Sequence, residues 1–232
     1  ELAGSALHAD AGLHPVRALI ERRCGITRGV GGAERLRLLQ DELMTCDLDP
    51  TQTVPLLAPV LGLGPEHGYQ PAVVEGLTLY ELIRTTVRQY LLGCLGDGPA
   101  LIVAEDMHWF DPSTIELLAS LAGDANGRLL LVMTGRDGDW RDKDWRAKVF
   151  DLAPLSDDQS DALIDALHPD VTDTQRAAIR SRCDGVPFYL EHVIAELKAG
   201  GPDSRVPEAL YEPLMSRLPM HRCLRACFLP QR

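Results

Sequence analysis

Two short apolar runs, separated by one helical pattern, constrain this chain more than any other feature. Residues 100–104 read ALIVA and residues 129–134 read LLLVMT, and both runs are bounded by glycine or charged residues. Continuous aliphatic runs of this length are typical of strands that are buried on both faces. Together with the helical pattern between them, the runs predict an α/β fold.

The segment between these runs, DPSTIELLASLAGDANG, has the features of a single helix. Asp111 is suited to cap its amino terminus, Pro112 fits the first helical position, and Gly123 is suited to close the helix. Strand, helix and strand then form a right-handed βαβ unit. A weaker apolar pattern predicts a third strand around residues 149–152.

Helical patterns flank this unit on both sides. Residues 1–95 place apolar side chains at helical spacing, most clearly over residues 78–95. Residues 47–76, rich in proline and glycine, are expected to be loop and short helix. Beyond residue 152 the pattern is purely helical. The helix starts there carry two capping boxes, whose residue pairs are Ser156 with Gln159 and Thr172 with Gln175.

The charge and hydropathy of the chain restrict its partners. The chain has 23 basic and 34 acidic residues, which gives a net charge of -11. A broad nucleic-acid surface would need a basic patch, so we expect none. Two interpretations remain for the arginines between residues 217 and 232. They form a local basic patch, or, more simply, they belong to a solvated tail. No apolar run approaches the ~18 residues of a membrane span, which predicts a cytoplasmic protein without a membrane partner.

Six cysteines are scattered along the chain, at positions 24, 46, 94, 183, 223 and 227, and no two form a CxxC pair. Cys223 and Cys227 are four residues apart, but no further pair of cysteine or histidine residues stands at zinc-finger spacing from them. We therefore expect reduced thiols that serve mostly as packing residues.

Charged residues follow both apolar runs. Glu105 and Asp106 come directly after the first run, and Arg136 follows the second. In an open α/β sheet, ligands bind at the carboxyl ends of the strands, and neighbouring strands lie about 5 Å apart. Two carboxylates and a guanidinium would then face one crevice. Carboxylates there hold Mg²⁺ or orient water, and an arginine offsets phosphate charge.

Each of these residues also has a purely structural interpretation. Glu105 and Asp106 are compatible with the polar start of a loop, and Arg136 is compatible with a surface turn. His108 and Trp109 are equally compatible with packing at the edge of the sheet. The functional interpretation therefore depends on the combination of residues rather than on any one of them.

The string LIVAEDMHWFDPSTIELLASLA, residues 101–122, resembles the Walker B segment of bacterial STAND-class ATPases, a branch of the AAA+ superfamily of P-loop NTPases. These domains occur in LuxR-type transcriptional regulators and behind nucleotide-cyclase domains such as adenylate cyclases. The TGR at residues 134–136 is similar to the family's sensor strand. LAPLSDDQSDALIDAL and CDGVPFYLEHVIAEL look like its lid helix and its G-x-P segment, so the resemblance spans about residues 1–218.

The resemblance implies that ATP or ADP binds together with Mg²⁺. It implies that Glu105 and Asp106 hold the metal, with one of them positioning the attacking water. It does not assign the two tasks, because many relatives have the reverse order, Asp-Glu. Arg136 would be the catalytic sensor residue. The residues that the resemblance implies near the nucleotide are Gly185, Pro187 and His108.

The phosphate-binding loop of the family is missing from this sequence. A P-loop requires G-x-x-x-x-G-K-[ST], whereas none of the three lysines, Lys143, Lys148 and Lys198, follows a glycine. The chain thus looks truncated before the Walker A strand, which in the family lies between the sensor strand and the last strand of the sheet. We expect residues 129–134 to present an unpaired apolar edge, open to a protein partner or to the missing amino-terminal segment.

The expected fold is an incomplete parallel P-loop NTPase-type sheet with flanking helices, followed by an α-helical lid module. The expected domains are residues 1–152 for the partial core and residues 153–201 for the lid. Residues 202–232 would contain one more helix, at the start of a winged-helix-like region, and a divergent tail.

The function expected from the resemblance is an ATP-binding regulatory domain in signal transduction, present as a fragment and hydrolysing ATP negligibly. DNA would be contacted only through a domain outside this chain. The alternative is a non-catalytic interaction protein that binds no nucleotide. An unrelated enzyme that uses Glu105 and Asp106 as acid and base is disfavoured, because no nucleophile accompanies them.

Overall fold

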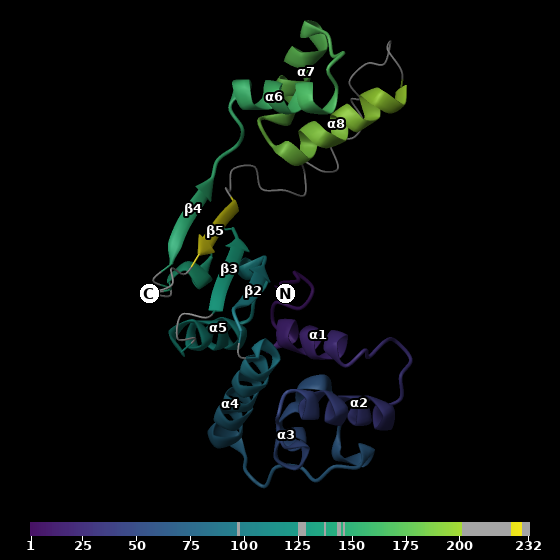
Figure 1. Cartoon of the computed structure of the whole chain (residues 1–232), viewed down its shortest axis with the longest axis vertical. Helices are drawn as coiled ribbons and strands as arrows, with labels where there is room; N and C mark the ends of the chain where they lie inside the picture. Colours follow the sequence, from purple (N-terminus) through teal and green to yellow (C-terminus); the bar gives the residue numbers. More distant parts are fainter. Residues whose placement is uncertain are drawn as a thin grey trace. The chain divides into compact units, whose positions relative to one another are not determined.

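The chain forms two compact units in the computed structural model (Figure 1). The first comprises Glu1–Phe150 with Arg225–Arg232, and the second comprises Asp151–Leu224. Each unit has its own hydrophobic core. The residues that the structure describes are 1–96, 98–124, 129–136, 138–142, 145, 147–200 and 224–228.

Four helices precede the first long strand. They are α1 (His14–Arg23), α2 (Gly32–Thr45), α3 (Pro50–Leu57) and α4 (Gly76–Leu95). Three of them, α1, α2 and α4, lie where the apolar spacing predicts. The stretch between α2 and α4 contains α3 and the short 3₁₀ helices η1 (Pro59–Leu61) and η2 (Pro65–His67), which confirms the prediction of loop and short helix. The apolar faces of these helices pack in one core, whose fully buried members include Ile20, Leu39, Leu43, Leu57 and Tyr90.

The sheet confirms the α/β fold and the parallel arrangement of the two apolar runs. The strands in the described part of the chain are β1 (Leu2–Ala3), β2 (Ala100–Glu105), β3 (Leu129–Gly135), β4 (Lys148–Leu152) and β5 (Leu224–Phe228). Their order is β1-β2-β3-β5-β4. β1 runs parallel to β2, and β2 runs parallel to β3 with Ala100 opposite Leu129. β2 is less enclosed than predicted, because Leu101 is 56% exposed.

β5 overturns one expectation from the sequence. The apolar edge of β3 is paired rather than open, because β5 runs antiparallel to it with Val132 opposite Phe228. β4 likewise has β5 as its neighbour (Figure 1). β5 comes from the carboxyl-terminal tail, whose aperiodic sequence gave no indication of a strand. The expected incomplete parallel sheet is therefore a mixed sheet.

The helix after β2 begins as predicted. α5 (Pro112–Asp124) is capped by the buried Asp111, whose Oδ1 accepts a hydrogen bond from the backbone N–H of Thr114 at 3.0 Å. The other carboxylate oxygen accepts from the Thr114 hydroxyl at 2.6 Å. The helix continues through Gly123 to Asp124, so Gly123 does not close it as predicted.

The described residues of the second unit from Asp157 to Gly200 form three helices. They are α6 (Asp157–Leu167), α7 (Asp173–Cys183) and α8 (Pro187–Gly200). Both predicted capping boxes are present, at Ser156 and at Thr172. The fully buried residues of this core include Ile164, Ile179, Cys183 and Leu190. The helix predicted over residues 202–218 lies outside the described residues.

Candidate functional site at the strand ends

The acidic pair lies in a tight turn at the carboxyl end of β2. Glu105 is the last residue of the strand and Asp106 follows it, and both are exposed to solvent. Asp106 has φ 56° and ψ 47°, a left-handed conformation that aspartate tolerates better than most residues. Its carbonyl oxygen accepts a hydrogen bond from the backbone N–H of Trp109 at 2.8 Å, at the end of the 3₁₀ helix η3 (Met107–Trp109). The turn therefore presents two acidic residues to solvent at the edge of the sheet.

The neighbouring strands hold this turn in place. The backbone N–H of Gly4, just after β1, donates to the carbonyl oxygen of Glu105 at 2.8 Å. A Cβ atom at Gly4 would lie only 2.4 Å from the carbonyl oxygen of Asp106, so a larger residue would displace the turn. On the other side, the backbone N–H of Asp106 donates a long hydrogen bond of 3.4 Å to the hydroxyl of Thr134 on β3.

His108 connects the acidic turn to the end of β3. Its Nδ1 accepts a hydrogen bond from the backbone N–H of Arg136 at 3.3 Å. Burial lowers the pKa of His108 below its ordinary value; Asp106 partly opposes this shift, and Arg136 adds to it. A neutral imidazole that accepts at Nδ1 carries its proton at Nε2. Nε2 is buried and has no hydrogen-bond partner among the residues that the structure describes.

Two tryptophans fix the segment that follows β3. The indole N–H of Trp140, in η4 (Asp139–Asp142), donates to the carbonyl oxygen of Arg136 at 2.8 Å. The indole N–H of Trp145 donates in turn to the carbonyl oxygen of Trp140 at 2.6 Å, and both side chains are buried. Because β2 and β3 are paired in parallel, their ends bring together four predicted site residues, Glu105, Asp106, His108 and Arg136.

A cavity of about 520 Å³ lies beside η3 and the start of α5, next to the carboxyl end of β2. Most of its lining is apolar, and the lining residues are Met107, His108, Phe110, Pro112, Ile115, Glu116, Gly138 and Trp140. Glu105, Asp106 and Arg136 do not line it. Its size is in the range of small-molecule sites. Its lining suits a mostly apolar group better than a triphosphate, and His108 is the predicted site residue that faces it.

The two remaining predicted site residues belong to the second unit. Gly185 has φ 70°, and a Cβ atom there would lie 2.3 Å from the carbonyl oxygen of Leu155. The backbone N–H of Leu155 donates to the carbonyl oxygen of Gly185 at 2.8 Å. Pro187 is the first residue of α8. The fold alone therefore explains both residues of the G-x-P segment, because the glycine allows the close approach to Leu155 and the proline starts α8.

Comparison with known proteins adds no further assignment. No protein-family model matches the sequence, and no significant match occurs among curated proteins or solved structures. Within the described part of the chain, no helix combines the length and the apolar character that a membrane span requires. The roles of the strand-end residues therefore depend on the sequence resemblance and on the geometry.

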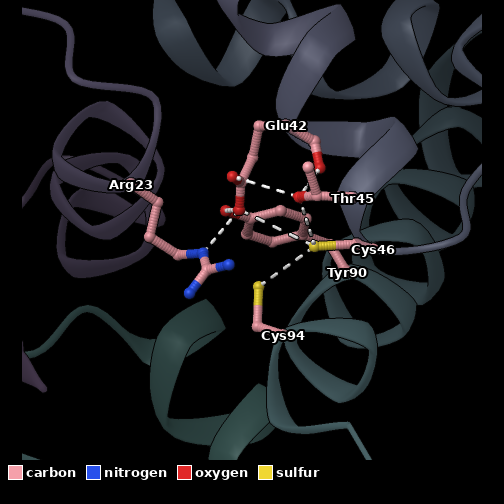
Figure 2. A network of polar contacts seen from close by, with 6 residues as sticks. All are labelled: Arg23, Glu42, Thr45, Cys46, Tyr90 and Cys94. Atoms are coloured by element: carbon pink, nitrogen blue, oxygen red, sulfur yellow. Dashed lines mark hydrogen bonds and ion pairs between the residues drawn. The ribbon is translucent and has the colours of Figure 1, made fainter.

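A second cluster, of polar and thiol side chains, lies among the helices, and the sequence did not predict it. Figure 2 shows its members, Arg23, Glu42, Thr45, Cys46, Tyr90 and Cys94. One donor atom each of Glu42, Cys46 and Cys94 lies within 4.8 Å of the other two. The spacing of Glu42 and Cys46 places them on one helical face, which is a weak signal alone. Cys94 joins them only through the packing of α4, which no local pattern reveals.

Proposed function

We propose that this chain is a nucleotide-responsive regulatory domain of the STAND class of AAA+ ATPases, which binds ATP or ADP with Mg²⁺ at the carboxyl ends of β2 and β3. The observation that carries the proposal is the placement of Glu105, Asp106 and Arg136 at one edge of two paired parallel strands. This edge is where open α/β sheets bind their ligands.

The order of the strands supports the same proposal. The resemblance assigns β2 to the Walker B strand, β3 to the sensor strand and β4 to the last strand of the family's sheet. In the family the P-loop strand lies between the last two, and β5 takes that place here. β1 pairs with β2 on the other side, as the strand before the Walker B strand would. This order, with β5 in the place of the P-loop strand, supports the proposal.

The side chains at this edge suit distinct tasks. The carboxylates of Glu105 and Asp106 would hold Mg²⁺ through its bound waters, and the guanidinium of Arg136 would offset phosphate charge. The Nε2–H of His108 would donate a hydrogen bond to the ligand. Because the sequence has no Walker A lysine or glycine loop, the phosphates lose their usual cradle, and we expect negligible hydrolysis of ATP.

Calorimetry with ATP or ADP in the presence of Mg²⁺ tests the proposal on the full chain. We expect Mg²⁺-dependent binding that Asp106→Asn weakens about tenfold or more, because asparagine keeps the left-handed backbone while removing the charge. Asp158→Asn is the matched control, since Asp158 is an exposed aspartate on α6. A folded chain that binds neither nucleotide would refute the proposal, as would equal affinities in the two variants.

One observation favours a second function, that of an interaction protein that does not bind nucleotide. β5 is antiparallel to β3, so it cannot lead into a phosphate loop at the carboxyl end of the parallel strands. A domain whose P-loop position is filled in this way would keep the helical surfaces of the fold without its ligand. Absence of nucleotide binding in a sample that is folded by circular dichroism would favour this function.

A further inference from the structure

Three side chains of the first unit bring one carboxylate and two thiols together. The Sγ atom of Cys46, the residue after α2, lies 3.7 Å from the Sγ atom of Cys94 on α4. The same Cys46 Sγ atom lies 3.7 Å from Oε1 of Glu42 on α2. Figure 2 shows the three side chains pointing toward one another.

These separations are those of ligands around a single tetrahedral metal ion. Zinc–sulfur bonds of about 2.3 Å at the tetrahedral angle place two sulfur atoms about 3.8 Å apart. With a zinc–oxygen bond of about 2.0 Å, a sulfur atom and an oxygen atom lie about 3.5 Å apart. The two separations from the Cys46 sulfur therefore fit a tetrahedral ion, and the donor atoms of Glu42 and Cys94, which lie within 4.8 Å of each other, would move together around it.

We propose that Glu42, Cys46 and Cys94 form a binding site for a thiophilic divalent metal ion, and that Zn²⁺ is the ion that fits best. Thiolate ligands select zinc over Mg²⁺ or Ca²⁺, which prefer oxygen. Three protein ligands leave the fourth tetrahedral position to a water molecule. The site is separate from the strand-end residues, so it does not depend on the function proposed for them.

Two further side chains hold the carboxylate in position for this role. Oε1 of Glu42 accepts hydrogen bonds from Nε of Arg23 at 2.5 Å and from the hydroxyl of Tyr90 at 3.1 Å. Within the described residues, the other oxygen, Oε2, has only a long contact of 3.4 Å with the hydroxyl of Thr45. Hydrogen-bonded partners of this kind orient metal-binding carboxylates. The 3.7 Å separation from the Cys46 sulfur is that of Oε1, so binding of an ion through Oε2 requires the carboxylate to turn.

The local charges also balance with a divalent ion present. Two thiolates and one carboxylate around a divalent cation carry a net charge of −1. The guanidinium of Arg23, which contacts the carboxylate, compensates this charge. Compensation matters because the Glu42 side chain is only 10% exposed and an uncompensated buried charge is costly. Cys46 is buried, whereas Cys94 is partly exposed and gives an ion a route from solvent.

A simple contact between the two thiols, or a disulfide between them, would involve fewer of the clustered side chains. Two thiols in simple contact require neither the carboxylate nor Arg23. A disulfide requires its sulfur atoms about 2.05 Å apart, so Cys46 and Cys94 would have to approach each other. Neither arrangement accounts for the convergence of Glu42 and its charged partner on the same point. The metal site accounts for all four side chains.

Titration of the fully reduced, metal-free chain with Co²⁺ and then Zn²⁺ tests the site. We expect one Co²⁺ per chain, with the absorption bands of tetrahedral coordination and of thiolate-to-cobalt charge transfer, and displacement of Co²⁺ by Zn²⁺. Cys46→Ser and Cys94→Ser are each expected to weaken metal affinity about tenfold or more, since a direct ligand should matter at least as much as an outer partner. Cys183→Ser, in the second unit, is the control and should bind as the unsubstituted chain does.

A measurement on the unsubstituted chain keeps the test valid if a variant fails to fold. Zn²⁺ should slow alkylation of Cys94 by iodoacetamide about tenfold or more, as followed by peptide mass spectrometry. Absence of Co²⁺ binding by the folded, reduced chain would overturn the proposal. So would alkylation of Cys94 at the same rate with and without Zn²⁺.

Discussion

Gly93 on α4 lies directly against the backbone of Cys46. A Cβ atom at Gly93 would be 2.7 Å from the carbonyl oxygen of Cys46 and 3.1 Å from its Cβ atom. The missing side chain lets α4 approach the end of α2 closely. The next residue along α4, Cys94, then contacts the Cys46 sulfur. The thiol pair thus depends on a glycine that has no chemistry of its own.

Gly93→Ala should therefore destabilise the first unit and separate the two sulfur atoms. We expect a loss of about 1–3 kcal/mol, the usual cost of overpacking, because a backbone carbonyl cannot move aside as a flexible side chain can. Urea unfolding measures the change in stability. Gly98→Ala is the control, since a Cβ atom there meets nothing within 4 Å. Equal stability of the two variants would show that α4 does not pack as described.

Gly4→Ala should displace the acidic turn. The added methyl group would lie 2.4 Å from the carbonyl oxygen of Asp106 and 3.1 Å from the ring of Phe110. We expect destabilisation of about 1–3 kcal/mol in urea unfolding, together with shifted backbone NMR resonances for residues 105–110. Gly12→Ala, where a Cβ atom meets nothing within 4 Å, should leave both unchanged. Unshifted resonances in the Gly4 variant would contradict the contact.

Thr172→Ala should weaken the start of α7. The Thr172 hydroxyl accepts from the backbone N–H of Gln175 at 3.3 Å, and the Gln175 side chain accepts from the backbone N–H of Thr172 at 3.0 Å. Loss of such a cap costs about 0.5–2 kcal/mol. Hydrogen exchange in the first turn of α7 should accelerate accordingly. Thr174→Ala removes the same atoms from an exposed position in the same helix and should not accelerate it.

The stability of the first unit should fall in alkaline solution. Burial, with a smaller effect of Glu42, raises the pKa of the Cys24 thiol from 9.0 to about 12. The folded chain thus holds this proton more tightly than the unfolded chain does. The resulting stabilisation is complete below about pH 9 and is lost as the pH rises toward about 12.

Cys24→Ala should reduce this loss. Urea midpoints measured from about pH 8 to about pH 11 should fall less steeply for the variant than for the unsubstituted chain. The two chains are compared by the slope of the urea midpoint against pH, because removal of a buried side chain changes the absolute stability as well. Parallel slopes would show that Cys24 does not carry the effect.

Local signals explain what could be predicted from the sequence. The cap at Asp111 and the box at Thr172 form within a few residues, and the apolar run of β3 identifies its own strand. Pairing between remote segments could not be predicted in the same way. β5 becomes a strand because β3 offers it an edge, and Cys94 reaches Cys46 because α4 passes close to the residue that follows α2. The tertiary partner, rather than the local sequence, decides both.

The place of β5 in the sheet also affects how the chain folds during synthesis. Val132 pairs with Phe228, and the whole second unit separates them in the sequence. At about 5–20 residues per second, translation delivers β3 several seconds before its partner. During this interval the edge of β3 is open to any other strand. A nascent chain interrupted before residue 224 would carry an open sheet edge, a hazard that disappears once β5 has been synthesised and has paired with β3.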